Sequence, residues 1–295
     1  MSRLLLRIGL LCLLPLGLVR CAAPGVPGQP PGCEVTPRAD LPLEQGLRRL
    51  IVPAEVNGQT VKLEFRTDLG AELTLTPQAA AQLKLPPGAP LVIGQQSLPQ
   101  VRVDALRVGA LPARPALAQI RGPEGVLPPG SPAAGLLGLA ATQGLDIDID
   151  PAARRLRLYA VLGCGDRLIP FAEAHGALPL GRGPQGQFLV PVTLDGTALR
   201  AVLSSGSDAT LLSRAGAERA GAKLPPIQPG APRLGLVPFR RLELGDMLLQ
   251  EPRMLVIEVP LAGDAVLGND FLLRQRIWIS PATSKVYVAR QPATP

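Results

Sequence analysis

Two stretches of the chain repeat the same order of residues. They are Val56-Asn57-Gly58 followed by Val61-Lys62-Leu63-Glu64-Phe65-Arg66-Thr67-Asp68-Leu69-Gly70-Ala71, and Leu194-Asp195-Gly196 followed by Leu199-Arg200-Ala201-Val202-Leu203-Ser204-Ser205-Gly206-Ser207. Each copy starts with a two-residue hairpin signal and continues as an apolar strand. An apolar pair and glycine follow later in each half, as Leu136-Leu137-Gly138 and Val266-Leu267-Gly268. The repeat predicts an internal duplication that aligns Asp68 with Ser204, 136 residues apart.

The duplication predicts two β-rich lobes of about 110 residues each. Glycine and proline number 32 and 34, which favours many short strands over long helices. Thr76 and Ser213 are placed as N-caps, so each lobe should carry one short helix. The halves close with matching strand, turn and strand patterns over 147–158 and 277–288. We therefore predict an all-β fold with two lobes packed as a pseudo-dimer.

These signals divide the chain into six segments. They are a signal peptide (1–23), a Pro/Gly-rich tether (24–48), lobe 1 (49–160), an inter-lobe linker (161–186), lobe 2 (187–290) and a short tail (291–295).

The N-terminus has the features of an export signal. Arg3 and Arg7 precede an apolar run over 8–19 that is too short to span a bilayer. Two processing routes remain open, because Leu18-Val19-Arg20-Cys21 resembles a lipobox that would lipidate Cys21, whereas cleavage after Ala23 would release the chain. We expect an exported protein, periplasmic or envelope-associated, whose only membrane attachment would be through Cys21.

Cysteine usage supports an oxidising compartment. Cys12 lies inside the signal, and Cys21 is either lipidated or removed, which leaves Cys33 and Cys164. An even pair in an exported chain predicts one disulfide, Cys33–Cys164.

The formal net charge of +7 falls to +4 once Arg3, Arg7 and Arg20 leave with the signal. No basic cluster is interleaved with aromatic residues, so the composition does not indicate nucleic-acid binding. We expect a monomer.

The order of strand, Asp68-Leu69-Gly70-Ala71, strand, short helix and apolar-apolar-Gly resembles the retropepsin-like aspartic peptidases. Two copies in one chain resemble the pepsin-like, single-chain form. The resemblance implies that two aspartates share a proton and activate a water, so Asp68 would be the catalytic acid of lobe 1. It also implies supporting roles for Gly70, Ala71, Gly138, Gly206 and Gly268.

Three departures from the family pattern bear on activity. Ser204 stands where the second acid is expected, so no carboxylate pair can form. Leu69 replaces a hydroxyl residue that in the family bonds across to the other lobe, whereas Ser205 retains it. Arg66 lies two residues before Asp68 on the same strand face and would hold that carboxylate ionised.

Two functions follow as alternatives. One is a catalytically impaired peptidase homologue that binds peptide or protein segments in a cleft between the lobes. The other is an active aspartic endopeptidase with Asp68 as its acid/base. Neither requires a cofactor or a metal.

Other motifs favour structural roles. Gly181-Arg182-Gly183-Pro184-Gln185-Gly186 has dinucleotide-fingerprint spacing but precedes a strand, so we expect a loop. Asp146, Asp148 and Asp150 alternate along an amphipathic strand and do not form a calcium-type loop. His175, the only histidine, lies in the predicted linker, which argues against a serine-histidine site for Ser204 or Ser205.

Overall fold

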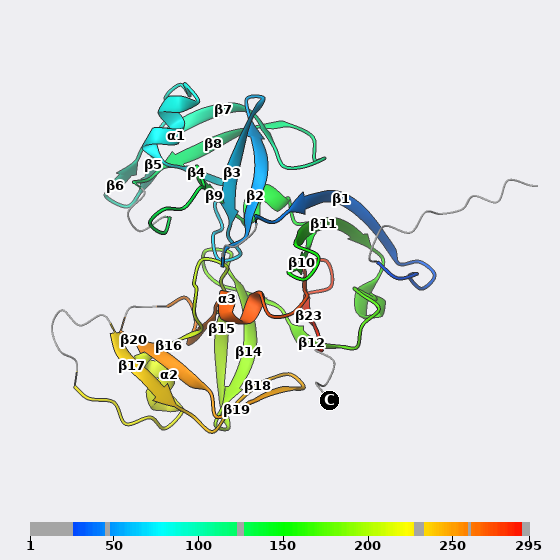
Figure 1. The fold of residues 1–295 in the computed structure, drawn as a ribbon, viewed down its shortest axis with the longest axis vertical. Coiled ribbons are helices and arrows are strands. Elements are labelled where there is room, and N and C mark those ends of the chain that lie inside the picture. Colours follow the sequence, from blue (N-terminus) through cyan, green and yellow to red (C-terminus); the bar gives the residue numbers. More distant parts are fainter. Residues whose placement is uncertain (1–25, 45–47, 123–126, 227–232, 259–260, 291–295) are drawn as a thin grey trace, which may run out of the picture.

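The computed structural model describes residues 26–44, 48–122, 127–226, 233–258 and 261–290. The predicted signal peptide, Cys21 and the tail lie outside these residues. The chain folds into two β lobes joined by a third sheet (Figure 1). The prediction of an all-β fold with two lobes is therefore confirmed.

Lobe 1 is a closed barrel of six strands in the order β2-β3-β9-β4-β8-β7. Its strands are β2 (Ile51–Val56), β3 (Gln59–Phe65), β4 (Leu73–Leu75), β7 (Gln100–Arg107), β8 (Arg114–Ile120) and β9 (Gly135–Leu137), with a separate hairpin of β5 (Leu91–Ile93) and β6 (Gln96–Leu98). The helix α1 (Pro77–Gln82) begins at Thr76, whose hydroxyl accepts from the amide of Ala79, and the 3-10 turn η1 (Leu139–Thr142) follows Gly138. The predicted N-cap is thus present.

Lobe 2 repeats this arrangement around a nine-stranded sheet. Its strands are β13 (Gly181–Arg182), β14 (Phe188–Leu194), β15 (Thr197–Leu203), β16 (Leu211–Ser213), β17 (Arg233–Pro238), β18 (Arg241–Leu244), β19 (Met247–Gln250), β20 (Arg253–Ile257) and β21 (Ala265–Leu267). Ser213 caps α2 (Arg214–Arg219), and α3 (Asn269–Leu272) takes the place of η1. The hairpin turns at Asn57-Gly58 and Asp195-Gly196 both have positive φ, as a tight β-turn of this kind requires.

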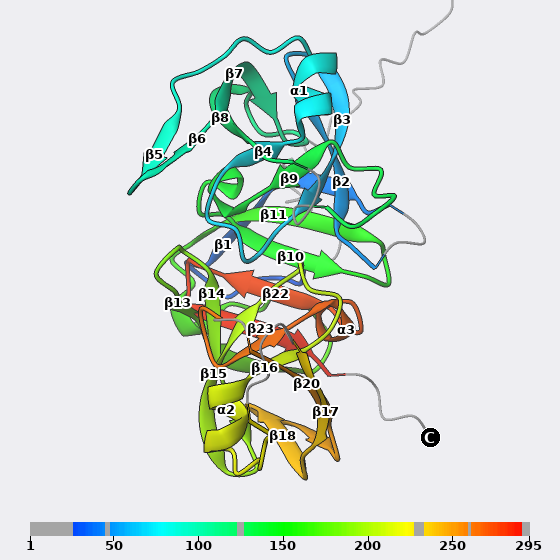
Figure 2. The ribbon, with the colours of Figure 1, turned by 90° about the vertical axis from the view of Figure 1, so that its left-hand side faces the viewer.

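The third sheet lies between the lobes and takes strands from both halves of the chain (Figure 2). Its order is β1 (Glu34–Pro42), β11 (Arg155–Leu162), β10 (Asp146–Asp150), β22 (Ile277–Ser280), β23 (Lys285–Ala289) and β12 (His175–Pro179). The central pair β10 and β22 joins the two repeats, and Asp148 lies opposite Trp278. The duplication therefore extends beyond the lobes, since β1 and β12 occupy the two outer positions.

This sheet corrects two predictions. The predicted tether contributes β1, and the predicted linker contributes the end of β11, the 3-10 turn η2 (Gly165–Arg167), β12 and β13. Both strands, β1 and β12, lack strong sequence periodicity because few of their side chains are buried. Leu41 and Leu178 nevertheless anchor the two strands in the apolar core.

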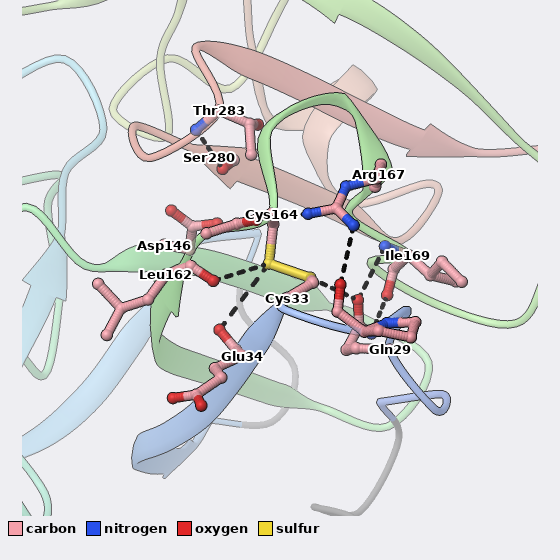
Figure 3. Close-up of a disulfide and its surroundings, with 12 residues drawn as sticks. Gln29, Cys33, Glu34, Asp146, Leu162, Cys164, Arg167, Ile169, Ser280 and Thr283 are labelled. Carbon is pink, nitrogen blue, oxygen red and sulfur yellow. Dashed lines mark hydrogen bonds between the residues drawn. A yellow bond between two sulfur atoms is a disulfide. The ribbon is translucent and has the colours of Figure 1, made fainter.

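The predicted disulfide between Cys33 and Cys164 is confirmed (Figure 3). It joins the start of β1 to the segment that follows β11. Around it, Arg167 donates to the carbonyl of Pro31 at 2.8 Å, and Gln29 exchanges hydrogen bonds with the backbone of Ile169. The disulfide thus fastens the N-terminal segment to the outer edge of the central sheet.

Among the described helices, none has both the length and the apolar character needed to cross a bilayer.

Candidate functional site

The candidate site lies at the two turns that follow β3 and β15, where the lobes meet. In lobe 1, Phe65 pairs in parallel with Leu137, and the amide of Arg66 donates to Leu137 O at 2.9 Å. In lobe 2, Leu203 pairs in parallel with Leu267, and the amide of Ser204 donates to Leu267 O at 3.0 Å. Arg66 and Ser204 are therefore the equivalent first residues of the two turns.

The next residue of each turn bonds to the opposite lobe. The hydroxyl of Thr67 donates to Leu203 O at 2.8 Å and accepts from the amide of Ser205 at 3.0 Å. Reciprocally, the hydroxyl of Ser205 donates to Phe65 O at 2.7 Å and accepts from the amide of Thr67 at 3.0 Å. Both side chains are fully buried. These four hydrogen bonds fix the lobes to each other at one point.

These contacts show that the predicted register, with Asp68 opposite Ser204, is wrong by two residues. The hydroxyl residue that bonds across the interface in lobe 1 is Thr67, and Leu69 does not take this role. Thr67 and Ser205 are 138 residues apart, so Arg66 is opposite Ser204 and Asp68 is opposite Gly206. The carbonyls of Leu69 and Ser207, which accept from the equivalent amides of Leu139 and Asn269, keep the same offset.

The error has a physical origin. Asp68-Leu69-Gly70-Ala71 resembles the Asp-Thr/Ser-Gly-Ala motif in sequence. The position at which the turn begins is set by strand pairing and not by this motif. Gly70 has a different function, because a Cβ there would overlap the carbonyl oxygen of Gln185 from lobe 2. Gly138 and Gly268 lie behind the turns, where a Cβ would meet the carbonyls of Ala71 and Ala209 respectively.

Arg66 and Asp68 form a bidentate ion pair within the first turn. Arg66 Nε lies 2.9 Å from Asp68 Oδ1, and Nη2 lies 2.7 Å from Oδ2. Burial alone would raise the pKa of Asp68, but the hydrogen bonds and charge of Arg66, with a hydrogen bond from Ser204, hold it below its usual value. Asp68 is therefore an ionised carboxylate that bridges the two lobes.

A second arginine crosses the interface beside this pair. Arg49 donates to Glu64 Oε1 at 3.2 Å, to Gly206 O at 2.6 Å and to Asp208 Oδ2 at 2.9 Å. Glu64 is fully buried, and burial raises its pKa despite the nearby Arg49 and Arg66. Its Oε2 has no hydrogen-bond partner among the described residues.

Sequence reasoning missed Thr67, Glu64 and Arg49. A signal for Thr67 was present, because Gly58 and Gly196 of the two hairpins are also 138 residues apart. No comparable signal exists for Arg49, since two of its three partners, Gly206 and Asp208, lie in the other lobe.

The three aspartates of β10 have structural partners. Asp148 is fully buried and accepts from Arg276 at 2.9 and 2.8 Å and from Arg157 at 3.2 Å. Asp146 accepts from Trp278 Nε1 at 2.8 Å. Across the described ranges, no three His, Cys, Asp or Glu side chains gather in a way that could hold a metal ion.

The other two motifs also have structural settings. His175 lies in β12, edge-on to the rings of Phe171 and Tyr287. The segment Gly181–Gly186 forms β13 and a turn, and its Gln185 covers Gly70.

Comparison with known proteins adds little. No family model and no curated protein matches the sequence. Among solved structures, the chain is similar to the basic 7S globulin from soybean, with a TM-score of 0.49 and 12% identity over 88% of this chain and 95% of the globulin.

Chemically, the two turns offer the carboxylate of Asp68 and the hydroxyl of Ser204, because the hydroxyls of Thr67 and Ser205 are engaged across the interface. A water held between two carboxylates is the core of the aspartic peptidase mechanism. Here an arginine and a serine occupy the two equivalent positions, and the nearest carboxylate is paired with that arginine.

Proposed function

We propose that this chain is an exported homologue of the aspartic peptidases that binds peptide segments between its lobes and does not cleave them. The observation that supports the proposal is the reciprocal bonding of Thr67 and Ser205. In the register that it defines, Arg66 and Ser204 would stand at the two positions where the family has its acids. A proton cannot be shared between a guanidinium and a hydroxyl as it is between two carboxylic acids.

A cavity at the lobe boundary supports the binding role. It has a volume of about 320 Å³ and is lined by Arg48 and Arg49, the loop over 128–132, and Asp208 of lobe 2. Backbone carbonyls, two arginines and proline surfaces suit an extended peptide, whose amides and apolar side chains they can contact.

The export component rests on the disulfide and on the sequence of residues 1–23. Disulfides persist in oxidising compartments and are rare in the bacterial cytosol. Mass spectrometry of the N-terminus from an envelope fraction distinguishes a lipidated Cys21 from cleavage after Ala23.

The decisive experiment is peptide hydrolysis by the purified mature protein between pH 3 and 7. We expect no turnover for the wild type and for Asp68→Asn. The double variant Arg66→Asp/Ser204→Asp, which places acids at both equivalent positions, should acquire hydrolysis if the cleft is otherwise intact. Wild-type turnover that Asp68→Asn abolishes would overturn the proposal.

Binding needs its own measurement. Fluorescently labelled peptides from a casein digest should bind the wild type saturably, and Ser131→Trp, which fills the cavity at the boundary, should weaken that binding at least fivefold. Exposed Leu117 lies on β8 and does not line this cavity, so Leu117→Trp is the matched control and should bind as the wild type does.

The alternative, an active endopeptidase, has one observation in its favour. Asp68 remains about one-fifth exposed and receives a hydrogen bond from Ser204 across the interface. A carboxylate with its pKa held low could act as a base for a water molecule, although it would lack the acid that polarises the peptide carbonyl. The Asp68→Asn comparison above tests this alternative directly.

A further inference from the structure

The duplicated fold allows one cavity in lobe 2 to be compared with the equivalent position in lobe 1. The equivalent positions are fixed by pairing, because Val56 pairs with Leu106 in lobe 1 and Leu194 pairs with Leu242 in lobe 2. Ala141 and Phe271 correspond in the same way, since their amides donate to Gly138 O and Gly268 O.

In lobe 1 this position is filled. The connection between β7 and β8 is a wide loop whose Val108 and Leu111 are buried against the barrel. Between this loop, Leu106 and Ala141 there is no space that a water molecule could occupy.

In lobe 2 the same position is open. The strands β18 and β19 are joined by the short turn Gly245-Asp246, so no side chain folds inward as Leu111 does. A cavity of about 630 Å³ remains under this hairpin and beside α3. Figure 1 shows the hairpin extending below α3, close to the C-terminal end of β23.

The walls of the cavity are mainly apolar. Leu244, Met254 and Leu267 form a buried base, while Leu248 and Leu249 of β19 are 49% and 39% exposed. Exposed leucines beside an unfilled apolar space are typical of a ligand site and are unfavourable when left in water.

The polar groups of the lining are predominantly cationic. Arg253, Arg274 and Arg290 line the cavity with the single carboxylate of Asp270, and Arg290 is also paired with Asp246 of the hairpin turn. Both oxygens of Asp270 already accept hydrogen bonds from Thr210, at 2.9 and 2.8 Å. Arg253 is exposed and makes no ion pair within the described part of the chain. The lining therefore favours an anion over a cation.

We propose that this cavity binds a single-chain amphiphile with an anionic head, of the fatty-acid class, with the alkyl chain on the leucine and methionine surface and the head at Arg253. The volume lies within the range of small-molecule sites, which is about 300–1,000 Å³. None of the residues of the two interface turns lines it, so the proposal is independent of the peptide-binding function.

The test is calorimetric titration of the mature protein with three ligands of equal chain length, below their micelle concentrations. We expect decanoate to bind saturably at one site and at least tenfold more tightly than decanol, with decyltrimethylammonium the weakest. Arg253→Glu should weaken decanoate about tenfold and leave decanol within twofold, because it reverses a charge on the protein surface. Leu249→Trp, which fills the cavity, should weaken both ligands at least tenfold.

Lobe 1 supplies matched controls. Arg102→Glu and Leu117→Trp alter exposed residues that face each other on β7 and β8, and both variants should bind decanoate within twofold of the wild type. Circular dichroism and urea unfolding of each variant check that it is folded. If Leu249→Trp does not fold, Arg253→Glu alone decides, since it changes an exposed side chain.

Several outcomes would overturn the proposal. These are an absence of saturable decanoate binding, equal affinity for the three ligands, or decanoate binding that survives both variants. Sedimentation at the concentrations used tests one further outcome. If the protein is a dimer that Leu249→Trp dissociates, a second copy of the chain covers the site and the proposal is overturned.

Discussion

The guanidinium of Arg66 in lobe 1 lies directly on the backbone of Gly206 in lobe 2, in the space that a Cβ at Gly206 would occupy. Asp68 holds it there through two hydrogen bonds. The interface of the lobes is thus closed at this point by a charged side chain.

This contact makes Gly206 a sensitive position. Gly206→Ala should lower the free energy of unfolding by about 1–3 kcal/mol, because the new methyl group must displace Arg66 from Asp68 or shift the backbone. Urea unfolding followed by circular dichroism measures the effect. In an Arg66→Ala background, the same substitution should cost less than about 0.5 kcal/mol, since the overlap is gone. An equal cost in both backgrounds would show that the strain lies in the backbone and that Arg66 is not its source.

The reciprocal bonds between Thr67 and Ser205 lead to a second prediction. Thr67→Val removes one hydroxyl and leaves the amide of Ser205 and the carbonyl of Leu203 buried without partners, so we expect a loss of about 2–4 kcal/mol. Thr67→Ser keeps the hydroxyl and should cost less than half as much. Both are measured by urea unfolding. A loss for Thr67→Ser as large as that for Thr67→Val would contradict the prediction, because it would mean that the methyl group of Thr67 contributes as much stability as its hydroxyl.

The fold was largely predictable because duplication doubles every weak signal. The turns at Asn57-Gly58 and Asp195-Gly196 and the helix caps at Thr76 and Ser213 each have a counterpart in the other half. The edge strands β1 and β12 were missed since only Ala39 and Leu41 of β1 and Leu178 of β12 are buried, which leaves little alternation in their sequences.

The site was only partly predictable. Similarity of the sequence motifs aligns Asp68 with Ser204. The backbone pairing of β3 with β9 and of β15 with β21 instead aligns Arg66 with Ser204. A two-residue difference of this kind cannot be resolved by composition or periodicity, because both registers keep the same strand face. The spacing of Gly58 and Gly196 favours the offset of 138, and the strand pairing within each lobe and the contacts of Thr67 between the lobes establish it.

The disulfide supports a third prediction. Cys33 and Cys164 are 131 residues apart, so their link restricts a long loop of the unfolded chain and should stabilise the protein by about 5 kcal/mol in a chain-entropy estimate. Cys33→Ser/Cys164→Ser should lower the free energy of unfolding by about 2–5 kcal/mol in urea. Under reducing conditions the wild type should approach the stability of the variant, and an oxidised wild type no more stable than the variant would contradict the prediction.

The ionised state of Asp68 makes the stability of the interface depend on pH. Its pKa in the folded protein is below the value of about 3.9 expected for the unfolded chain. A depressed pKa contributes stability that is fully present above the unfolded pKa and is lost as the pH falls through the folded pKa. At pH 7, Asp68→Asn should therefore be less stable than the wild type, by about 2 kcal/mol for a charge-assisted pair that is partly buried. The deficit should shrink below about pH 4 and disappear once Asp68 is protonated in the folded wild type.

Urea unfolding of the two proteins at intervals from pH 7 to pH 2 measures this difference. Asp104→Asn is the matched control, because Asp104 is exposed on β7 and makes no ion pair within the described residues, so its stability should follow the wild type across the range. The double variant Arg66→Met/Asp68→Asn should show the same flattened pH profile as Asp68→Asn, since the pair acts as a unit. A deficit of Asp68→Asn that stays constant down to pH 2 would show that the side chain contributes through its shape and not through its charge.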